Sequence, residues 1–564
     1  MTRLTLPPFL IDPALTRTVS RGRRLATLAR LSFPTAMGAL ALAVAACSSS
    51  AGRLACGRPS GSPPVAAAAP APCCAPAPLG VAGLPQPDFN SEAYDSVREN
   101  EFILATTEPL STFSVDVDTA SYANVRRFLD EGAWPPAGAV RTEELVNYFA
   151  YDDAAPTDGR AFAASIEATT CPWTPSHRLV RIGIKGREMS KNGRPPCNLV
   201  FLVDVSGSMQ EENKLPLVQK SLRTLVDQLD GRDRISLVVY AGASGLVLPP
   251  TSCQDKRRIK AAIDSLSAGG STNGAAGLEL AYLEAQAGFL ANGANRVILA
   301  TDGDFNVGIT DQGSLVSLIE QKAKSGIALT CLGFGMGNLK DSTLEKLADH
   351  GDGNYGYIDD VREAEKLFIR QAWGTLFTVA KDVKLQVEFN PALVAAYRLI
   401  GYENRRLEKQ DFNDDKKDAG DVGAGHTVTA LYEIVPAGVP IAATGVDPLR
   451  YQGVAVLSPK ATSNELLTVK IRHKIPGEAT SRLDVYPLID LGATPFNTAS
   501  ENLRFGAAVA AFGMLLNDSK NRGAADFGWV RETAKRARGR DEGGDRKQFV
   551  ALVDKAESLK GKAK

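Results

Sequence analysis

The sequence has little of what zinc proteins, nucleic-acid-binding proteins and common hydrolases need. Its 564 residues include four histidines and no H-E-x-x-H or C-x-x-C motif, so a zinc site is not expected. Lysine plus arginine and aspartate plus glutamate both number 64, and no long basic block argues for nucleic acid as a partner. The G-x-S-x-G elbow of serine hydrolases and the G-K-[ST] phosphate loop are also missing.

The most apolar stretch near the start is also too short to span a membrane. Residues 31–46 are interrupted by a serine, a proline and a threonine and fall short of the roughly 20 residues that a spanning helix needs. The stretch is preceded by Arg21, Arg23, Arg24 and Arg30, and it closes with the small residues of V-A-A-C, which ends at Cys47. This order is typical of an export signal. The ending resembles the lipobox of bacterial lipoproteins, which implies that Cys47 carries lipid; plain secretion and a retained anchor are the alternatives.

The next segment is rich in alanine, proline, serine and glycine, as in GRPSGSPPVAAAAPAPCCAPAPLG. Such a composition buries too little apolar surface to offset the entropy of ordering, so it predicts a tether. We therefore expect a signal peptide at 1–46 and a tether at 47–90. The expected location is the cell envelope, with a lipid anchor in the membrane. Ser48 after the cysteine favours, by the resemblance to lipoproteins, the outer membrane with the protein facing the periplasm.

Four further cysteines are dispersed without metal-site spacing: Cys171, Cys197, Cys253 and Cys331. A Cys171–Cys197 disulfide in an oxidising compartment stays open, because the sequence does not give the distance between the two residues.

The middle of the chain alternates between strand and helix patterns. Apolar runs predict strands at 199–203, 234–240, 296–304 and 327–335, and helical spacing predicts the helices between them. Further helices are expected at 257–266, 275–290, 342–349 and 361–377. This alternation predicts an α/β fold with a doubly wound, mostly parallel sheet over 197–379. Ligands of such sheets bind at the carboxyl ends of the strands.

The flanking regions have different patterns. Residues 91–196 form an N-terminal region, and short alternating segments such as DVKLQVEF and TVTALYEI predict a β-rich antiparallel region over 380–495. The last region, 496–564, is expected to be a helical domain. Phe505, Val509, Phe512 and Leu516 lie on one helical stripe there, which predicts a core face.

Three clusters of oxygen-bearing side chains fall at strand ends of the α/β region. They are Asp204-Ser206-Ser208, Ser271-Thr272-Asn273 and Thr301-Asp302. Hydroxyls and carboxylates without sulfur or imidazole suit a hard cation such as Mg²⁺. The structural alternative is that the aspartate and serines cap the next helix and that S-T-N-G is a simple turn.

These clusters closely resemble the von Willebrand factor type A (vWA) domain and its metal-ion-dependent adhesion site. DVSGS at 204–208 matches the family's D-x-S-x-S, and TDG at 301–303 supplies its second aspartate. The resemblance implies that Ser206, Ser208 and Thr272 ligate the metal, with Ser271 as the alternative to Thr272. Asp204 and Asp302 would act largely through bound waters. The expected ion is Mg²⁺, or another divalent cation such as Ca²⁺ or Mn²⁺.

The resemblance extends beyond this domain to a group of bacterial vWA lipoproteins. It is carried by 108–149 and by the C-terminal ENLRFGAAVAAFGMLLNDS. It implies an envelope lipoprotein that is not an enzyme and that binds, through its metal, an envelope protein presenting an acidic residue. One alternative is a structural envelope protein whose metal only staples the loops. The other is an aspartyl-phosphate phosphatase using Asp116 and Asp118. Against it, the sequence lacks the suitably placed lysine and the acidic motifs that should follow these aspartates.

Overall fold

A computed structural model describes Tyr94 and residues 98–115, 118–242, 244–270, 274–303, 312–335, 340–417, 419–441, 457–492 and 494–562. The expected signal peptide and tether, with Cys47, lie outside these residues, as do Asp116, Ser271 and Thr272. All described residues belong to one compact unit. Within them, no helix combines the length and the apolar character needed to cross a membrane.

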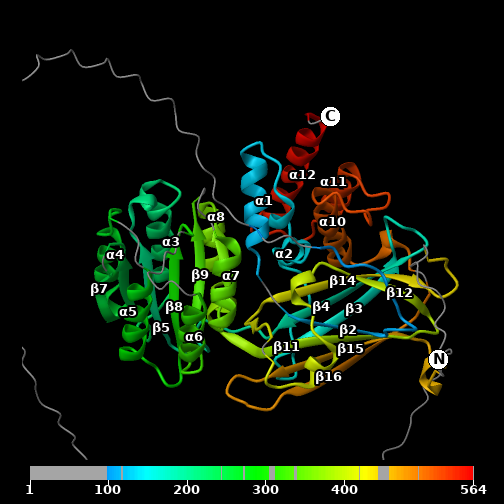
Figure 1. Cartoon of the computed structure of the whole chain (residues 1–564), viewed down its shortest axis with the longest axis horizontal. Coiled ribbons are helices and arrows are strands. Elements are labelled where there is room, and N and C mark those ends of the chain that lie inside the picture. The colour runs from blue at the N-terminus through cyan, green and yellow to red at the C-terminus, as the bar shows by residue number, and fades with distance from the viewer. Residues whose placement is uncertain are drawn as a thin grey trace, which may run out of the picture. The chain divides into compact units, whose positions relative to one another are not determined.

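The α/β region contains a six-stranded sheet in the order β10-β9-β8-β5-β6-β7 (Figure 1). Its strands are β5 (Cys197–Asp204), β6 (Arg234–Tyr240), β7 (Ser244–Ser252), β8 (Ala294–Thr301), β9 (Ile327–Phe334) and β10 (Tyr355–Ile358). All neighbours are parallel except β7, which pairs antiparallel with β6 at the edge. The predicted doubly wound, mostly parallel sheet is therefore confirmed. The sequence reading missed β7, whose two prolines are tolerated because it is an edge strand.

Helices cover both faces of this sheet. They are α3 (Leu215–Gln228), α4 (Lys256–Asp264), α5 (Gly274–Ala287), α6 (Gln312–Ala323) and α7 (Asp341–His350). Leu199, Phe201 and Val203 of β5 join the core that contains α3 and α4, whereas Val200 and Leu202 join the core that contains α5 to α7. Because successive strand side chains point to opposite faces, a continuous apolar run is what a doubly covered strand requires.

The helix expected at 361–377 is broken into three pieces. These are α8 (Val361–Glu365), a π-helical turn at Lys366–Arg370 and α9 (Ala372–Leu376). The amide of Gln371 bonds to the carbonyl of Lys366, five residues earlier, at 2.9 Å. A bond of that span widens the helix locally, and such turns occur frequently at functional sites.

Strands from before and after the α/β region share two further sheets. One has the order β1-β12-β14-β4-β3, and the other has β13-β11-β15-β16 with β2 paired to β11. Their bounds are β1 (Ile103–Leu104), β2 (Leu110–Ser114), β3 (Phe162–Thr170), β4 (Arg178–Gly186), β11 (Thr378–Phe389), β12 (Val394–Ile400), β13 (Val422–Gly423), β14 (Thr427–Pro436), β15 (Glu465–Lys474) and β16 (Arg482–Ile489). The regions 91–196 and 380–495 thus fold together, and the α/β region is inserted between them.

A helical group combines the two ends of the described chain. It consists of α1 (Ala120–Asp130), α2 (Thr142–Asn147), α10 (Glu501–Leu516), α11 (Phe527–Arg536) and α12 (Asp545–Lys562). The predicted stripe Phe505, Val509, Phe512 and Leu516 is buried in its core. Every residue from Phe505 to Leu516 is in fact buried, as expected of a helix that is apolar all round.

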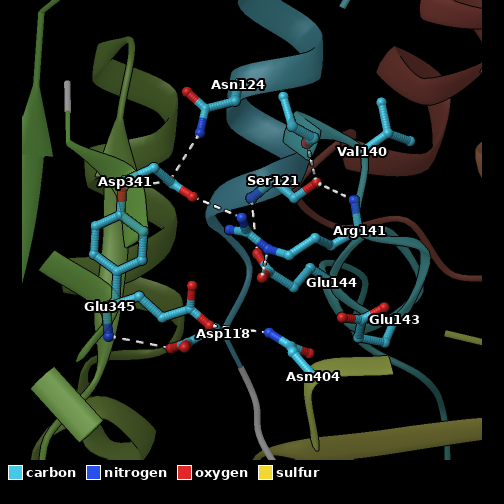
Figure 2. A network of polar contacts seen from close by, with 12 residues as sticks. Asp118, Ser121, Asn124, Val140, Arg141, Glu143, Glu144, Asp341, Glu345 and Asn404 are labelled. Carbon is cyan, nitrogen blue, oxygen red and sulfur yellow. Dashed lines mark hydrogen bonds and ion pairs between the residues drawn. The ribbon is translucent and has the colours of Figure 1, made fainter. Parts of the chain in front are cut away.

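A buried polar network joins this helical group to the α/β region (Figure 2). Arg141, which precedes α2, bonds to Asp341 of α7 at 2.6 Å and to Glu144 of α2. The carboxylate of Asp341 also accepts hydrogen bonds from the amide of Asn124 at 3.3 Å and from the hydroxyl of Tyr355 at 2.7 Å. Because Asp341 is fully buried, its charge depends on these donors for compensation.

We predict that Arg141→Met lowers the free energy of unfolding by about 3 to 5 kcal/mol, because it leaves buried carboxylates without their cation. Chemical denaturation of the full chain measures the change. Arg223→Met is the control, since Arg223 pairs with Asp264 at the surface, where the two side chains are 43% and 49% exposed. The free energy of unfolding of that variant should fall by less than about 1 kcal/mol. Equal losses in the two variants would contradict a special role for the buried pair.

Candidate metal centre

The ends of two neighbouring strands bring the predicted carboxylates together. Asp204 is the last residue of β5, and Asp302 directly follows β8. The two strands pair in parallel, with Val203 opposite Ala300. Both aspartates are fully buried. The hydroxyl of Thr301 bridges the strand ends by donating to Asp204 at 3.2 Å.

The Asp204 carboxylate is held from three directions. Besides Thr301, it accepts a hydrogen bond from the backbone N–H of Ser206 at 2.9 Å and from the hydroxyl of Tyr240 at 3.1 Å. Burial raises the pKa of Asp204, and the negative charge of Asp302 adds to this rise. Both effects disfavour the charged carboxylate, and a nearby cation would oppose them.

The two serines face each other next to this carboxylate. The hydroxyl oxygens of Ser206 and Ser208 lie 3.0 Å apart. Neither caps a helix by a side-chain hydrogen bond: Ser206 precedes a short turn without such a bond, and α3 begins after Lys214. The alternative in which these serines serve as helix caps therefore has no support in the geometry. Ser208 is half-buried and Gly207 is exposed, so the pair is open to solvent on one side.

The start of the third predicted loop lies against the same turn. The N–H of Gly207 donates to the carbonyl of Gly270 at 3.1 Å, and the N–H of Gly269 donates to the carbonyl of Val205 at 2.7 Å. Thr272 itself is not among the described residues. The contacts of Gly269 and Gly270 nevertheless bring the beginning of its loop to the edge where Asp204 and the serines lie.

The sequence reading missed a lysine at this site. Lys214 is 3% exposed, and its ammonium lies 3.1 Å from a carboxylate oxygen of Asp302. The sequence position of Lys214 indicates such a contact. Lys214 immediately precedes α3, where a positive charge interacts unfavourably with the helix dipole and therefore needs a carboxylate partner. The buried charge of Asp302 is thus compensated in part by the protein itself.

The donor set fits a hard cation. Within the described residues, no cluster of three or more histidine, cysteine, aspartate or glutamate side chains could hold a metal ion. Any ion at the strand ends would therefore depend on hydroxyl oxygens together with the two carboxylates. Oxygen donors of this kind suit Mg²⁺ or Ca²⁺ rather than a metal that needs sulfur or imidazole.

Asp118, the described half of the phosphatase alternative, has a structural environment. It is 4% exposed, accepts the backbone N–H of Tyr355 at 3.1 Å and pairs with Arg405 at 3.3 Å. A carboxylate so enclosed is poorly placed for nucleophilic attack.

The sequence left open whether Cys171 and Cys197 form a disulfide. In the structure both cysteines are free and buried.

Three family models match successive parts of the chain. Residues 88–181 match a family described as von Willebrand factor, 198–370 match the von Willebrand factor type A domain, and 374–559 match the C-terminal family of the uncharacterized protein YfbK. The α/β region is therefore a vWA domain. Domains of this type often bind a divalent metal and mediate protein interactions, and proteins that carry them are generally non-enzymatic interaction modules.

The chain is also similar to solved structures and to a curated relative. A von Willebrand factor type A structure from Catenulispora acidiphila is 16% identical, covering 71% of this chain and 90% of that one, with a TM-score of 0.39. Proximal thread matrix protein 1 from the mussel byssus, solved with a zinc-occupied MIDAS motif, is 24% identical over 31% of this chain and 44% of its own, with a TM-score of 0.27. The uncharacterized protein YfbK of Escherichia coli K12 is 44% identical over 473 residues, which are 83% of this chain and 81% of YfbK. The chain therefore belongs to the family of bacterial vWA domain proteins that includes YfbK.

Proposed function

We propose that this protein binds a divalent cation, Mg²⁺ in the first place, at the ends of β5 and β8 and uses it to hold a partner protein in the cell envelope. The observation that carries the proposal is the pair of facing hydroxyls, Ser206 and Ser208, 3.0 Å apart beside two fully buried carboxylates. This arrangement offers several oxygen donors from one turn.

The proposed roles follow from the surroundings of each side chain. Ser206 and Ser208, with Thr272 from the adjacent loop, would bind the ion directly. Asp204 is already held by three donors, and Asp302 by Lys214, which suits both for support through water. A bound cation would supply a positive charge that the mainly neutral direct ligands do not cancel.

The same arrangement favours an acidic partner. Since Lys214 shares the charge of Asp302, less negative charge is left to neutralise an ion at the site. A carboxylate from a partner can then complete the ion's ligands through a charge-assisted contact. The exposed Gly207 and half-buried Ser208 leave this side accessible.

Gly303, with φ +99, turns the chain after Asp302 in a conformation that other residues rarely adopt.

The envelope location is proposed from the sequence around Cys47. The export-signal pattern before it and the Ala/Pro-rich tether after it suit a lipid anchor that holds the folded unit at a membrane surface. The second candidate function is a structural envelope protein in which the ion staples the strand-end loops. The contacts of Gly207 with Gly270 and of Gly269 with Val205 favour it, because they already join two of these loops.

We predict that Cys47→Ser releases the protein from the membrane into the soluble fraction, because it removes the atom that would carry the lipid. Fractionation of cells and immunoblotting measure the distribution. Cys171→Ser is the control and should stay with the membrane, since Cys171 is buried within the folded unit. Unchanged membrane association of Cys47→Ser would show that the anchor is assigned wrongly.

We predict that Asp204→Ala weakens Mg²⁺ binding at least tenfold, measured by isothermal titration calorimetry on the full chain. The substitution removes a carboxylate from the site and frees the N–H of Ser206, so the serine turn loses its support. Asp227→Ala, which changes a surface carboxylate paired with Lys260, is the control and should bind like the wild type. Circular dichroism establishes that both variants fold. A folded Asp204→Ala protein with wild-type affinity would exclude this site.

We predict that chelation of divalent cations and Ser206→Ala remove the same partner proteins in pull-downs from solubilised envelopes. Ser206→Ala deletes one hydroxyl of the facing pair while leaving its backbone contact with Asp204. Ser265→Ala, on an exposed serine at the end of α4, is the matched control. A partner set that survives both treatments would favour the structural function of the ion over metal-dependent binding.

A further inference from the structure

One face of helix α7 in the vWA domain carries three carboxylates in a row. Asp341, Glu345 and Asp349 follow one another at every fourth residue of α7, so they lie on the same side of the helix. Asp341 is fully buried, and Glu345 is 8% exposed. This face meets the segments before α2 and after β12 (Figure 2). Like charges at this spacing repel one another and destabilise a helix unless cations lie opposite.

Two arginines from outside the vWA domain lie opposite this row. Arg141, before α2, bonds to Asp341 at 2.6 Å. Arg405, in the short turn that follows β12, pairs with Glu345 at 2.5 Å and with Asp349 at 2.8 Å. The vWA domain is thus held at this face by charge, and one of the two arginines serves two of its carboxylates.

Both arginines also bind carboxylates on their own side. Arg141 bonds to Glu144, and Arg405 pairs with Asp118 at 3.3 Å. Together these side chains form what we call the acidic contact: Asp118, Arg141, Glu144, Asp341, Glu345, Asp349 and Arg405. Five carboxylates therefore share two guanidinium groups, and only the side chain of Asp349, 38% exposed, reaches water to a large extent. Buried charges in such excess are costly, and a carboxyl group can avoid the cost by binding a proton.

Glu345 is the member of the acidic contact best placed to hold that proton. Its arginine, Arg405, is divided among three carboxylates. Burial raises the pKa of Glu345 to about 8. The two arginines oppose this rise, whereas the carboxylates of Glu144 and Asp341 add to it. The neutral form of Glu345 is therefore favoured well above the pH at which an exposed glutamate loses its proton.

A second carboxyl group beside the acidic contact is in a similar state. Glu143 precedes Glu144 in α2 (Figure 2) and is 6% exposed. Its Oε2 atom has no hydrogen-bond partner within the described part of the chain. Burial, then the charges of Glu403 and Glu144, raise the pKa of Glu143 to about 8. Loss of a proton here would add to the excess of negative charge next to Glu144.

We propose that the acidic contact is a proton-dependent switch: the vWA domain packs firmly against α2 and the turn after β12 when Glu345 is protonated, and this packing weakens when the proton leaves. In an open contact Glu345 would have its ordinary pKa of 4.5, so closing the contact takes up a proton between about pH 4.5 and 8. The closed contact therefore loses stability as the pH rises through that range, and Glu345 causes no further change above it. The proposal does not depend on metal binding.

The test compares the wild type with Glu345→Gln, which keeps the shape of the neutral carboxyl group and removes its titration. Urea unfolding of the full chain is measured from about pH 5.5 to 8.5, with chelator and at constant ionic strength. We expect the unfolding equilibrium constant of the wild type, divided by that of Glu345→Gln, to rise by up to about tenfold per pH unit until about pH 8. The division removes the contribution of other titrating groups. Glu478→Gln, at a surface pair with Arg482, is the control and should follow the wild type at every pH.

Hydrogen exchange separates the acidic contact from the fold as a whole. After correction for the intrinsic effect of pH on exchange, the amides of α7 should lose protection between about pH 6 and 8 in the wild type and keep it in Glu345→Gln. The amides of β15 should change in neither protein. A ratio of unfolding constants that is independent of pH would overturn the proposal, because Glu345 would then be ionised throughout. Should Glu345→Gln fail to fold, unchanged protection of α7 in the wild type up to about pH 8 would overturn it.

Discussion

The insertion of the vWA domain between strands of shared sheets is the constraint on which the rest of the structure depends. β4, which precedes the domain, pairs with β14, which follows it, over eight residue pairs from Thr427–Lys185 to Ile434–Arg178. β2 and β11 are joined in the same way. Both ends of the inserted domain are therefore tied to one β framework. A domain fixed at both ends has less freedom than one on a single linker.

Buried charges add a second set of attachments to this framework. Arg141 reaches Asp341 of α7, and Arg126 of α1 binds Asp359, just before α8, and Glu363 within α8. Such pairs contribute little net stability compared with apolar packing, but losing one partner is costly. Their effect is to hold the vWA domain in one position against the helical group.

The strand-end site depends on how its buried charge is balanced. At the strand ends, negative charge is gathered at Asp204 and Asp302, and one lysine offsets part of it. Burial strengthens the field of these charges, because the interior screens charges less than water does. The strand ends thus offer a place suited to a cation.

The sequence by itself determined the features that follow from local patterns. Continuous apolar runs predicted β5, β8 and β9, and parallel strands place their carboxyl ends at one edge, which is why Asp204 and Asp302 could be brought together in advance. The helical stripe at Phe505 and Phe512 predicted its own burial. Only the tertiary structure decided the shared sheets, the edge strand β7 and the π-helical turn at Lys366. It alone showed that Lys214 reaches Asp302 and that Arg141 reaches Asp341, because these contacts join residues far apart in the chain, which no local periodicity records.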